Sequence, residues 1–571
     1  MKGLVFLLFL VLLPVLASPG YGANPPTDEA MSGELRMQEL ERQDQRLRQK
    51  IEQKETAVPE QEELPLPPQL ESQEKVTLTE INVIGVTLVK EQEINAITAP
   101  YLNKEVTITE LQKAADMITD AYRQKGYITS RAYLPPQKIE KGVLEIRVLE
   151  GMMGDMTLKG NRYFSTKLLS NMITIKKGHP FNYDTLRQDL VRINEQTDRL
   201  ARAVLAPGKE SGTTDLAIEV KDRLPIHVGF TADDFGSRYI DKQRYAVRLT
   251  HNNLLGLDDK LTFQYQLARD SRYFLKSIRY LLPIGLRTQF GIFAGFSRVK
   301  LGEELADLDV RGKSRVYGLF ANYSLIKNDN LKIDLNCGFD YKNVWNYQMG
   351  ELTSNDRLRV AKLGFESDLT DAFGRTVFTY EFDYGIPNIM GGLENKDIDA
   401  SRLGAGGKFV KNSLNLLRLQ KMPFGSALLW KNQMQLSPYT LAAAEQFQVG
   451  GIINVRGYPV AEAVGDSGYS MTWEWSFPLY FIPKNIKVPF SAAMLYDSLR
   501  IVGFYDWGNV QLKSPINTAE EKSKTLRSAG FGLRFNLPEN FSTRLEFAWP
   551  LDSTPSDGDH LHILWQVSKE F

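Results

Sequence analysis

Arg456 lies in an apolar stretch of the sequence that contains several glycines, where its charge needs an anionic partner. Residues 445–460 read EQFQVGGIINVRGYPV, in which apolar residues surround Arg456 and nearby glycines permit a tight fold-back. A loop of this composition should pack against the protein instead of extending into solvent. A packed Arg456 then needs an anionic partner, because an unpaired buried guanidinium is costly. Asp506 and Glu474 are available, each on or next to the polar phase of an alternating segment.

Other residues with chemical potential form weaker patterns. His560 and His562 make an HxH pair, but no third ligand lies nearby, so no metal site is expected. Glu381 and Asp383 fit the lining of a wet interior better than an acid and base pair. The Gly-Lys at 208–209 lacks the spacing of a phosphate-binding loop. We therefore expect no catalytic residue, no metal and no cofactor, and we do not expect an enzyme.

The composition narrows the class of protein further. The 571 residues carry 69 Lys and Arg against 69 Asp and Glu, so the formal charge is zero. This balance argues against a nucleic-acid partner held by bulk electrostatics. A single cysteine, Cys337, excludes an internal disulfide and a site built from several thiolates.

The N-terminal region predicts export. After Lys2, residues 4–16 form an uncharged apolar core that is too short to span a bilayer comfortably. Small residues follow it, so we expect a signal peptide over 1–22, cleaved after Gly22 or Ala23; an uncleaved anchor is the alternative. Residues 23–56 contain a highly charged helix-forming stretch that cannot lie in a dry core. Residues 57–75 are rich in proline and predict an extended linker.

An internal repeat follows the linker. Gly85 matches Gly160 and Ile118 matches Ile193, in each case 75 positions apart. Each copy reads strand, helix, helix, strand, strand, so we expect two small α+β modules over 76–151 and 152–222. This pattern resembles the POTRA domains that outer-membrane barrels carry in the periplasm.

Residues 223–571 change character and alternate apolar and polar residues in segments of about ten. In 470–477, for example, Met471, Trp473 and Trp475 alternate with Thr472 and Glu474. One apolar face and one polar face predict an all-β transmembrane barrel of about sixteen antiparallel strands, preceded by the two modules and an N-terminal helix. A soluble sandwich would give the same period. The last strand favours the barrel, because it carries apolar residues on one face and ends on an aromatic residue (Trp565, Val567, Phe571).

Strand parity assigns a side to each connection. Counting back from Phe571, which we place in the periplasm, the longest outside loop covers about 438–468 and contains Arg456. The alternation places Cys337 on the lipid face. The stretch 480–499 is long for a periplasmic turn, which leaves the start of the strand carrying Asp506 uncertain.

The motifs now resemble a known family, the two-partner secretion transporters or haemolysin secretion/activation proteins. Val455, Arg456, Gly457 and Tyr458 resemble the VRGY motif at the tip of their sixth extracellular loop. Two further segments resemble the strand motifs that face this tip, at Phe504, Gly508, Gly468 and Tyr469. The resemblance implies that Arg456 pairs with Asp506 and with Glu474 to hold the loop inside the barrel, and that residues 23–56 form a plug helix.

The resemblance also implies location and partners. It predicts a protein of a Gram-negative outer membrane, with POTRA domains in the periplasm that recognise an unfolded exoprotein, which then crosses the barrel. The client would be a haemolysin, an adhesin or a contact-dependent toxin. Outer-membrane lipid, the barrel-assembly machinery and periplasmic chaperones are the other expected partners. Two alternatives stay open: an outer-membrane insertase of the same superfamily and a passive porin.

Overall fold

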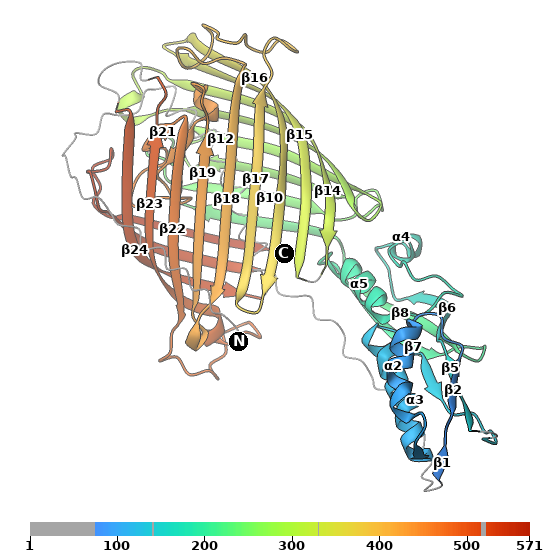
Figure 1. Cartoon of the computed structure of the whole chain (residues 1–571). Helices are drawn as coiled ribbons and strands as arrows, with labels where there is room; N and C mark the ends of the chain where they lie inside the picture. Colours follow the sequence, from blue (N-terminus) through green and yellow to red (C-terminus); the bar gives the residue numbers. More distant parts are fainter. Residues whose placement is uncertain (1–74, 140–141, 329, 515–520, 539) are drawn as a thin grey trace.

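The computed structural model describes residues 75–571 except 140–141, 329, 515–520 and 539. The expected signal peptide (1–22), the N-terminal helix (23–56) and nearly all of the linker (57–75) lie outside the described residues. In the part described, two small modules adjoin one end of a large barrel (Figure 1). None of the helices in this part is long and apolar enough to cross a membrane.

The first module is a three-stranded sheet covered by helices. Its elements are β1 (Lys75–Thr77), β2 (Glu80–Ile84), α2 (Glu91–Thr98), η1 (Ala99–Tyr101), β3 (Glu105–Thr107), α3 (Ile108–Gln124), β4 (Arg131–Tyr133) and β5 (Val143–Leu149). The sheet has the order β2-β5-β4, and β1 pairs separately with β3. Helix α3 begins with a capping box between Thr107 and Glu110. Its apolar face, with Leu111 and Ile118, joins Ile146 in the module core.

The second module repeats this plan. Its elements are β6 (Met152–Lys159), α4 (Thr166–Ser170), α5 (Tyr183–Asn194), β7 (Arg199–Pro207) and β8 (Thr213–Asp222). The sheet order β6-β8-β7 is equivalent to β2-β5-β4 of the first module. Leu186, Ile193 and Ile218 form its core with Phe164 and Phe181.

The glycines of the internal repeat have a shared structural role. Gly85 and Gly160 have φ of 89° and 88°, a region that favours glycine. A Cβ on Gly85 would lie 2.4 Å from the Val148 carbonyl oxygen, and one on Gly160 would lie 2.5 Å from that of Val220. Both modules therefore need glycine where the first strand leaves the sheet.

The remaining chain closes into a barrel of sixteen antiparallel strands, as the alternation predicted. The strands are β9 (Ile226–Asp233), β10 (Arg244–His251), β11 (Lys260–Ala268), β12 (Tyr273–Ile284), β13 (Thr288–Lys300), β14 (Arg311–Lys327), β15 (Leu331–Gln348), β16 (Glu351–Asp371), β17 (Gly374–Gly385), β18 (Phe409–Lys421), β19 (Ala427–Leu436), β22 (Ser467–Pro478), β23 (Leu499–Gln511), β24 (Ser523–Leu537), β25 (Phe541–Pro550) and β26 (His562–Glu570). β26 pairs with β9 and completes the ring. Closure pairs the backbone N–H and C=O groups at both edges of the sheet, because such groups cannot stay unpaired in the hydrocarbon core of a membrane.

Side-chain burial follows the period of two along the strands. On β22, Trp473 and Trp475 are 41% and 44% exposed, whereas Thr472 and Glu474 are almost completely buried. Aromatic rings also pack between neighbouring strands, as Trp430 on β19 does with Trp473 at 5.7 Å. The outward band is apolar and the inward face is polar, the arrangement of a barrel between lipid and water. Cys337 is exposed on its strand.

The C-terminal residues lie at the closing seam. Phe571 exchanges backbone hydrogen bonds with Val228, and its ring lies 6.3 Å from that of Phe230. Val567 is exposed and Trp565, half-buried, pairs with Leu545 on β25. The aromatic end thus covers the junction of the first and last strands.

The second module is fixed to the barrel through Asp198. This buried carboxylate accepts hydrogen bonds from His227 Nε2 at 2.8 Å, Asn252 Nδ2 at 2.8 Å and Arg223 Nε at 2.9 Å. Burial alone would raise the pKa of Asp198, but these hydrogen bonds outweigh burial and hold its pKa below the ordinary value. The module therefore meets β9 and the turn after β10 through a satisfied polar contact.

The long connection at 479–498 is ordered by short local structure. It contains α6 (Leu495–Ser498) and an isolated bridge between Lys487 and Met494, and β23 begins directly after α6. This settles the start of the strand that carries Asp506.

Candidate functional site

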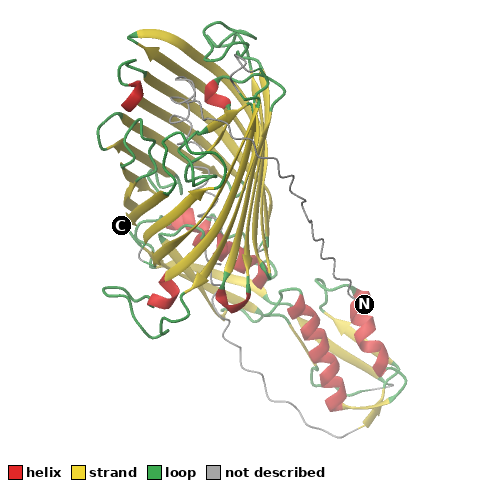
Figure 2. Ribbon diagram, turned by 90° about the vertical axis from the view of Figure 1, so that its left-hand side faces the viewer, coloured by secondary structure: helices red, strands yellow, loops and turns green. Residues whose placement is uncertain are grey.

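The connection between β19 and β22, residues 437–466, packs on the inner face of the wall of strands that Figure 2 draws in yellow. From 441 to 458 nearly every residue is buried, and Arg456 is 3% exposed. The loop contains η4 (Ala443–Glu445) and a short hairpin of β20 (Phe447–Val449) and β21 (Ala463–Gly465). Apolar residues dominate it because it packs on the inner wall.

Local hydrogen bonds shape the tip of the loop. Gly450 has φ of 115°, and a Cβ there would lie 2.1 Å from the Pro459 carbonyl oxygen. The Asn454 side-chain oxygen accepts from the backbone N–H of Gly450 at 2.9 Å and of Val455 at 2.8 Å. The next residue, Arg456, is thereby aimed at the wall.

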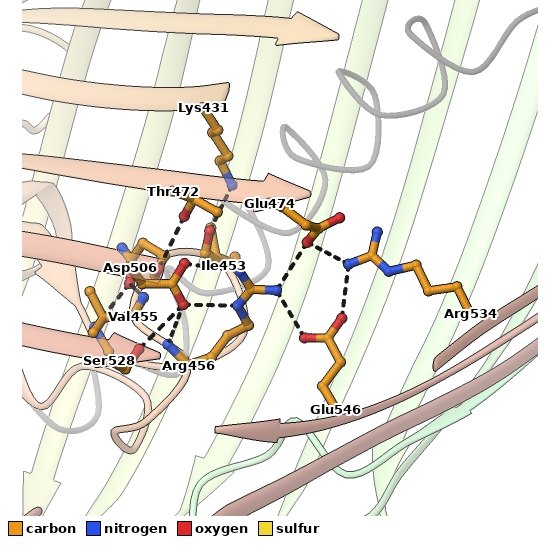
Figure 3. Close-up of polar contacts among 12 residues, drawn as sticks. Lys431, Ile453, Val455, Arg456, Thr472, Glu474, Asp506, Ser528, Arg534 and Glu546 are labelled. Atoms are coloured by element: carbon orange, nitrogen blue, oxygen red, sulfur yellow. Dashed lines mark hydrogen bonds and ion pairs between the residues drawn. The ribbon is translucent and has the colours of Figure 1, made fainter. Parts of the chain in front are cut away.

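Arg456 is clamped by three carboxylates (Figure 3). Its Nε and Nη2 donate to the two oxygens of Asp506 at 2.8 and 2.9 Å, a bidentate pair, and its backbone N–H reaches the same carboxylate at 3.2 Å. Its Nη1 donates to Glu474 at 3.0 Å and to Glu546 at 3.1 Å. The Phe504 ring lies 3.5 Å from the guanidinium. Charge-assisted, bidentate bonds of this kind are strong and directional.

A second arginine completes the cluster. Arg534 on β24 donates to Glu474 at 2.6 Å and to Glu546 at 2.9 Å. Two guanidinium groups therefore face three carboxylates, since Asp506 belongs to the same cluster. Each carboxylate is buried, so the pairing offsets the cost of desolvating all of these charges.

Two inward-facing glycines make room for the loop on the wall. A Cβ on Gly468 would lie 2.2 Å from the Phe447 ring, and one on Gly508 would lie 2.4 Å from Val449 Cγ1. These strand-motif positions thus present a flat surface to the hairpin. Tyr458 is buried beside the same apolar cluster, and its hydroxyl accepts from the Asp552 backbone N–H at 3.2 Å.

Two points differ from the sequence-based expectation. Tyr469 does not face the loop tip: it lies in the opposite phase from Gly468, hydrogen-bonded to Asn432 and 5.5 Å from the Trp507 ring. Glu546 and Arg534 were not predicted as members of the cluster. Glu546 alternates with apolar neighbours in Leu545-Glu546-Phe547, so strand phase alone could have placed it in the lumen.

The family described as haemolysin secretion/activation protein ShlB/FhaC/HecB matches residues 212–535, more than half of the chain. The chain belongs to this family. A POTRA domain of the type found in this family matches residues 76–151.

Relatives of the haemolysin secretion/activation family extend over most of the chain. A "Heme/hemopexin transporter protein HuxB" of Haemophilus influenzae is 25% identical over 88% of this chain and 88% of its own length. An "Outer membrane transporter CdiB" of Escherichia coli is 24% identical over 87% of this chain and 82% of its own length.

Solved structures show the same fold. CdiB from Escherichia coli has a TM-score of 0.70 at 23% identity and covers 96% of this chain and 99% of its own. CdiB from Acinetobacter baumannii has a TM-score of 0.63 at 17% identity, covering 96% of this chain and 100% of its own. The protein is an outer-membrane transporter of the two-partner secretion family, with a periplasmic POTRA domain, and exports a partner exoprotein; it is not an enzyme.

Proposed function

We propose that loop 437–466, held on the inner wall by Arg456, closes the lumen until an unfolded exoprotein displaces it on its way to the cell surface. The observation that carries the proposal is the buried bidentate pair of Arg456 with Asp506. A loop tied to the wall by charge can leave when competing polar groups enter, whereas a purely apolar plug would have to be hydrated. The client would be a large haemolysin, adhesin or contact-dependent toxin that passes in an extended form.

We also propose that the modules receive this client by adding one of its strands. Each module sheet ends on outer strands, β2 and β4 in the first and β6 and β7 in the second, although the start of β6 is already bridged to Pro180. Backbone hydrogen bonds along such an edge suit an extended polypeptide of varied sequence. Exposed apolar side chains near these edges would contact every second side chain of the added client strand: Ile84, Leu149, Met156, Leu200 and Val204.

The path from module to barrel supports this order of events. A cavity of about 1090 Å³ runs along the inner wall of the barrel and is also lined by Arg192 and Arg199 of the second module. A client bound at the modules would therefore enter a wet passage directly. In this scheme residues 1–22 are a signal peptide, 23–56 a plug helix and 57–75 a linker, with modules at 76–151 and 152–222 and the barrel at 223–571.

Other partners follow from the barrel itself. Lipid would cover the outward apolar band, and the barrel-assembly machinery and periplasmic chaperones would bring the chain to the membrane. Apolar and aromatic residues on the outside of β22 and β24, such as Trp475 and Phe531, fit such a band. The charge balance supports no nucleic-acid partner.

The Arg456→Ala variant tests the role of the loop. It should remain inserted and heat-modifiable, because the sixteen strands pair with one another and not with the loop. It should release several-fold less exoprotein into the medium, because a loop that has lost its anchor lies loose in the path of the client. Arg269→Ala is the matched control, since that arginine lies on the outside between β11 and β12 and its side chain is 61% exposed. Equal secretion by both variants and the unchanged protein would contradict the proposal.

Deletion of residues 76–150 tests the role of the first module. The barrel should still insert, while the client should remain in the periplasm. Undiminished secretion would remove this module from the recognition step.

A further inference from the structure

The loop has a second charged contact, at its base and on a different part of the wall. Glu445, the last residue of η4, is 1% exposed. Its carboxylate accepts from Lys342 on β15 at 3.0 Å and from Lys411 on β18. The Arg456 cluster lies instead on β22, β23, β24 and β25, so the two contacts are on either side of β19.

The lysines that hold Glu445 belong to a series of charges on the inner wall. Lys411 also lies 3.0 Å from Asp383, and Lys342 lies 3.7 Å from Asp340. Farther along the wall, Lys362 lies 3.3 Å from Asp340 and 3.1 Å from Glu381. Both lysines that contact Glu445 are at least nine-tenths buried. Each of these lysines therefore has a carboxylate of the wall beside it, and Glu445 adds a third negative charge that the two buried lysines share.

The end of the loop, at Asp466, is also fixed close to Glu445. Asp466 accepts from Arg402 Nη1 at 2.6 Å and from the Leu441 backbone N–H at 2.8 Å. The Gln435 amide at the end of β19 donates to the carbonyls of Glu445 at 2.9 Å and Asp466 at 3.1 Å. Both limbs are therefore held where the loop enters the barrel, independently of the tip.

We propose that Glu445, paired with Lys342 and Lys411, is a second anchor that keeps loop 437–466 across the lumen, and that release of the Arg456 cluster alone does not open the passage fully. The inference rests on the proposed function, in that it takes the loop to be the barrier. Glu445 is a positioning residue: it places the base of the loop on the β15–β18 wall while Arg456 places the tip. Loss of Arg456 alone would leave the base of the loop in place.

Single-channel recording in planar bilayers tests the second anchor with the full-length protein. Glu445→Gln should raise the open fraction several-fold with Arg456 intact, and Glu445→Gln combined with Arg456→Ala should exceed either single variant. The matched control is Glu381→Gln, which removes the same charge from the same wall, although its carboxylate pairs with Lys362 and not with the loop. Heat-modifiability of every variant checks that the barrel is folded.

A second variant guards against a folding defect at Glu445. Changing Lys342 and Lys411 together to Met removes the other half of the anchor and should open the channel similarly. If neither anchor variant exceeds Glu381→Gln while Arg456→Ala opens the channel, the second anchor is wrong and the proposed barrier stands. If neither the anchor variants nor Arg456→Ala changes the open fraction, whether residues 23–56 are present or deleted, the loop is not the barrier and both proposals fail.

Discussion

The lumen and the junction with the second module each bury one charged residue among partners from separate segments, but with opposite signs. In the lumen, the Arg456 guanidinium is surrounded by Asp506, Glu474 and Glu546. At the junction, the Asp198 carboxylate is surrounded by donors from Arg223, His227 and Asn252.

The two sites differ in what remains when the central residue leaves. Arg534 already bridges Glu474 and Glu546, so two of the three carboxylates in the lumen would keep a cationic partner after departure of Arg456. At the junction no second carboxylate is shared among the donors of Asp198 in the contacts described for it. The lumen cluster therefore keeps two carboxylates paired after Arg456 departs, as the proposed release of the loop requires, whereas the donors at the junction share no second carboxylate.

The largest effect should follow from removal of the main lumen carboxylate. Asp506→Ala leaves the buried Arg456 without its bidentate partner and should destabilise the docked loop by about 3–5 kcal/mol. Hydrogen–deuterium exchange of residues 447–458 in nanodiscs should accelerate accordingly. Asp506→Asn retains an oxygen acceptor and should have a smaller effect; unchanged exchange in both variants would contradict the clamp.

Removal of the junction carboxylate should act elsewhere. Asp198→Ala leaves three donors without their acceptor and should weaken the junction by about 1–3 kcal/mol. Exchange should increase at the backbone N–H groups of Arg223 and Asn252, which the junction protects, and not in the loop. A simultaneous change in the hydrogen–deuterium exchange of the loop would show that the two sites are coupled, which would contradict their separate roles.

Crowding the wall should loosen the loop without touching a charge. In Gly508→Ala the new methyl would meet Val449 at 2.4 Å and Val455 at 3.0 Å, and overpacking of this kind costs about 1–3 kcal/mol. Gly503→Ala on the same strand is the control, because a Cβ there meets nothing within 4 Å. Exchange of the loop should rise only in Gly508→Ala, and equal exchange in the two variants would argue against tight packing at Gly508.

Acidification should have the smallest effect of these changes, and it should act on the junction between the second module and the barrel. The pKa of Asp198 is lowered in the folded protein, so its contribution is present above the unfolded value of about 3.9 and is lost as pH falls through the folded pKa. Protection of the Arg223 and Asn252 amides, corrected for intrinsic exchange rates, should be constant from pH 7 to about pH 5 and decline below about pH 4. In Asp198→Asn this decline should be absent.

The sequence was sufficient for features with a short repeat. A period of two located the barrel strands and placed Glu474 on the inner face, and the 75-residue offset located Gly85 and Gly160. It was insufficient where partners come from distant strands. Glu546 and Arg534 join Arg456 because the register of the consecutive strands β23, β24 and β25 brings these residues close to the loop tip, and the sequence gives no register.

Phase and irregular segments were the other sources of error. Tyr469 was grouped with Gly468 from a motif, although adjacent strand residues must point to opposite faces. Glu445 and Asp198 lie outside any alternating segment, one at the end of a short 3-10 turn and the other before β7. Tertiary packing determines the partners of both residues, so no local sequence pattern predicts these contacts.

A charge-swap cycle tests the pairing of Arg456 with Asp506 most directly. Secretion of the exoprotein would be compared for Arg456→Asp, Asp506→Arg and the double variant, with heat-modifiability confirming a folded barrel in each. Both single variants should secrete poorly, since each places like charges together in a buried site, and the double variant should recover a substantial part of secretion. A double variant no better than the worse single one, or single variants that secrete normally, would contradict this pairing.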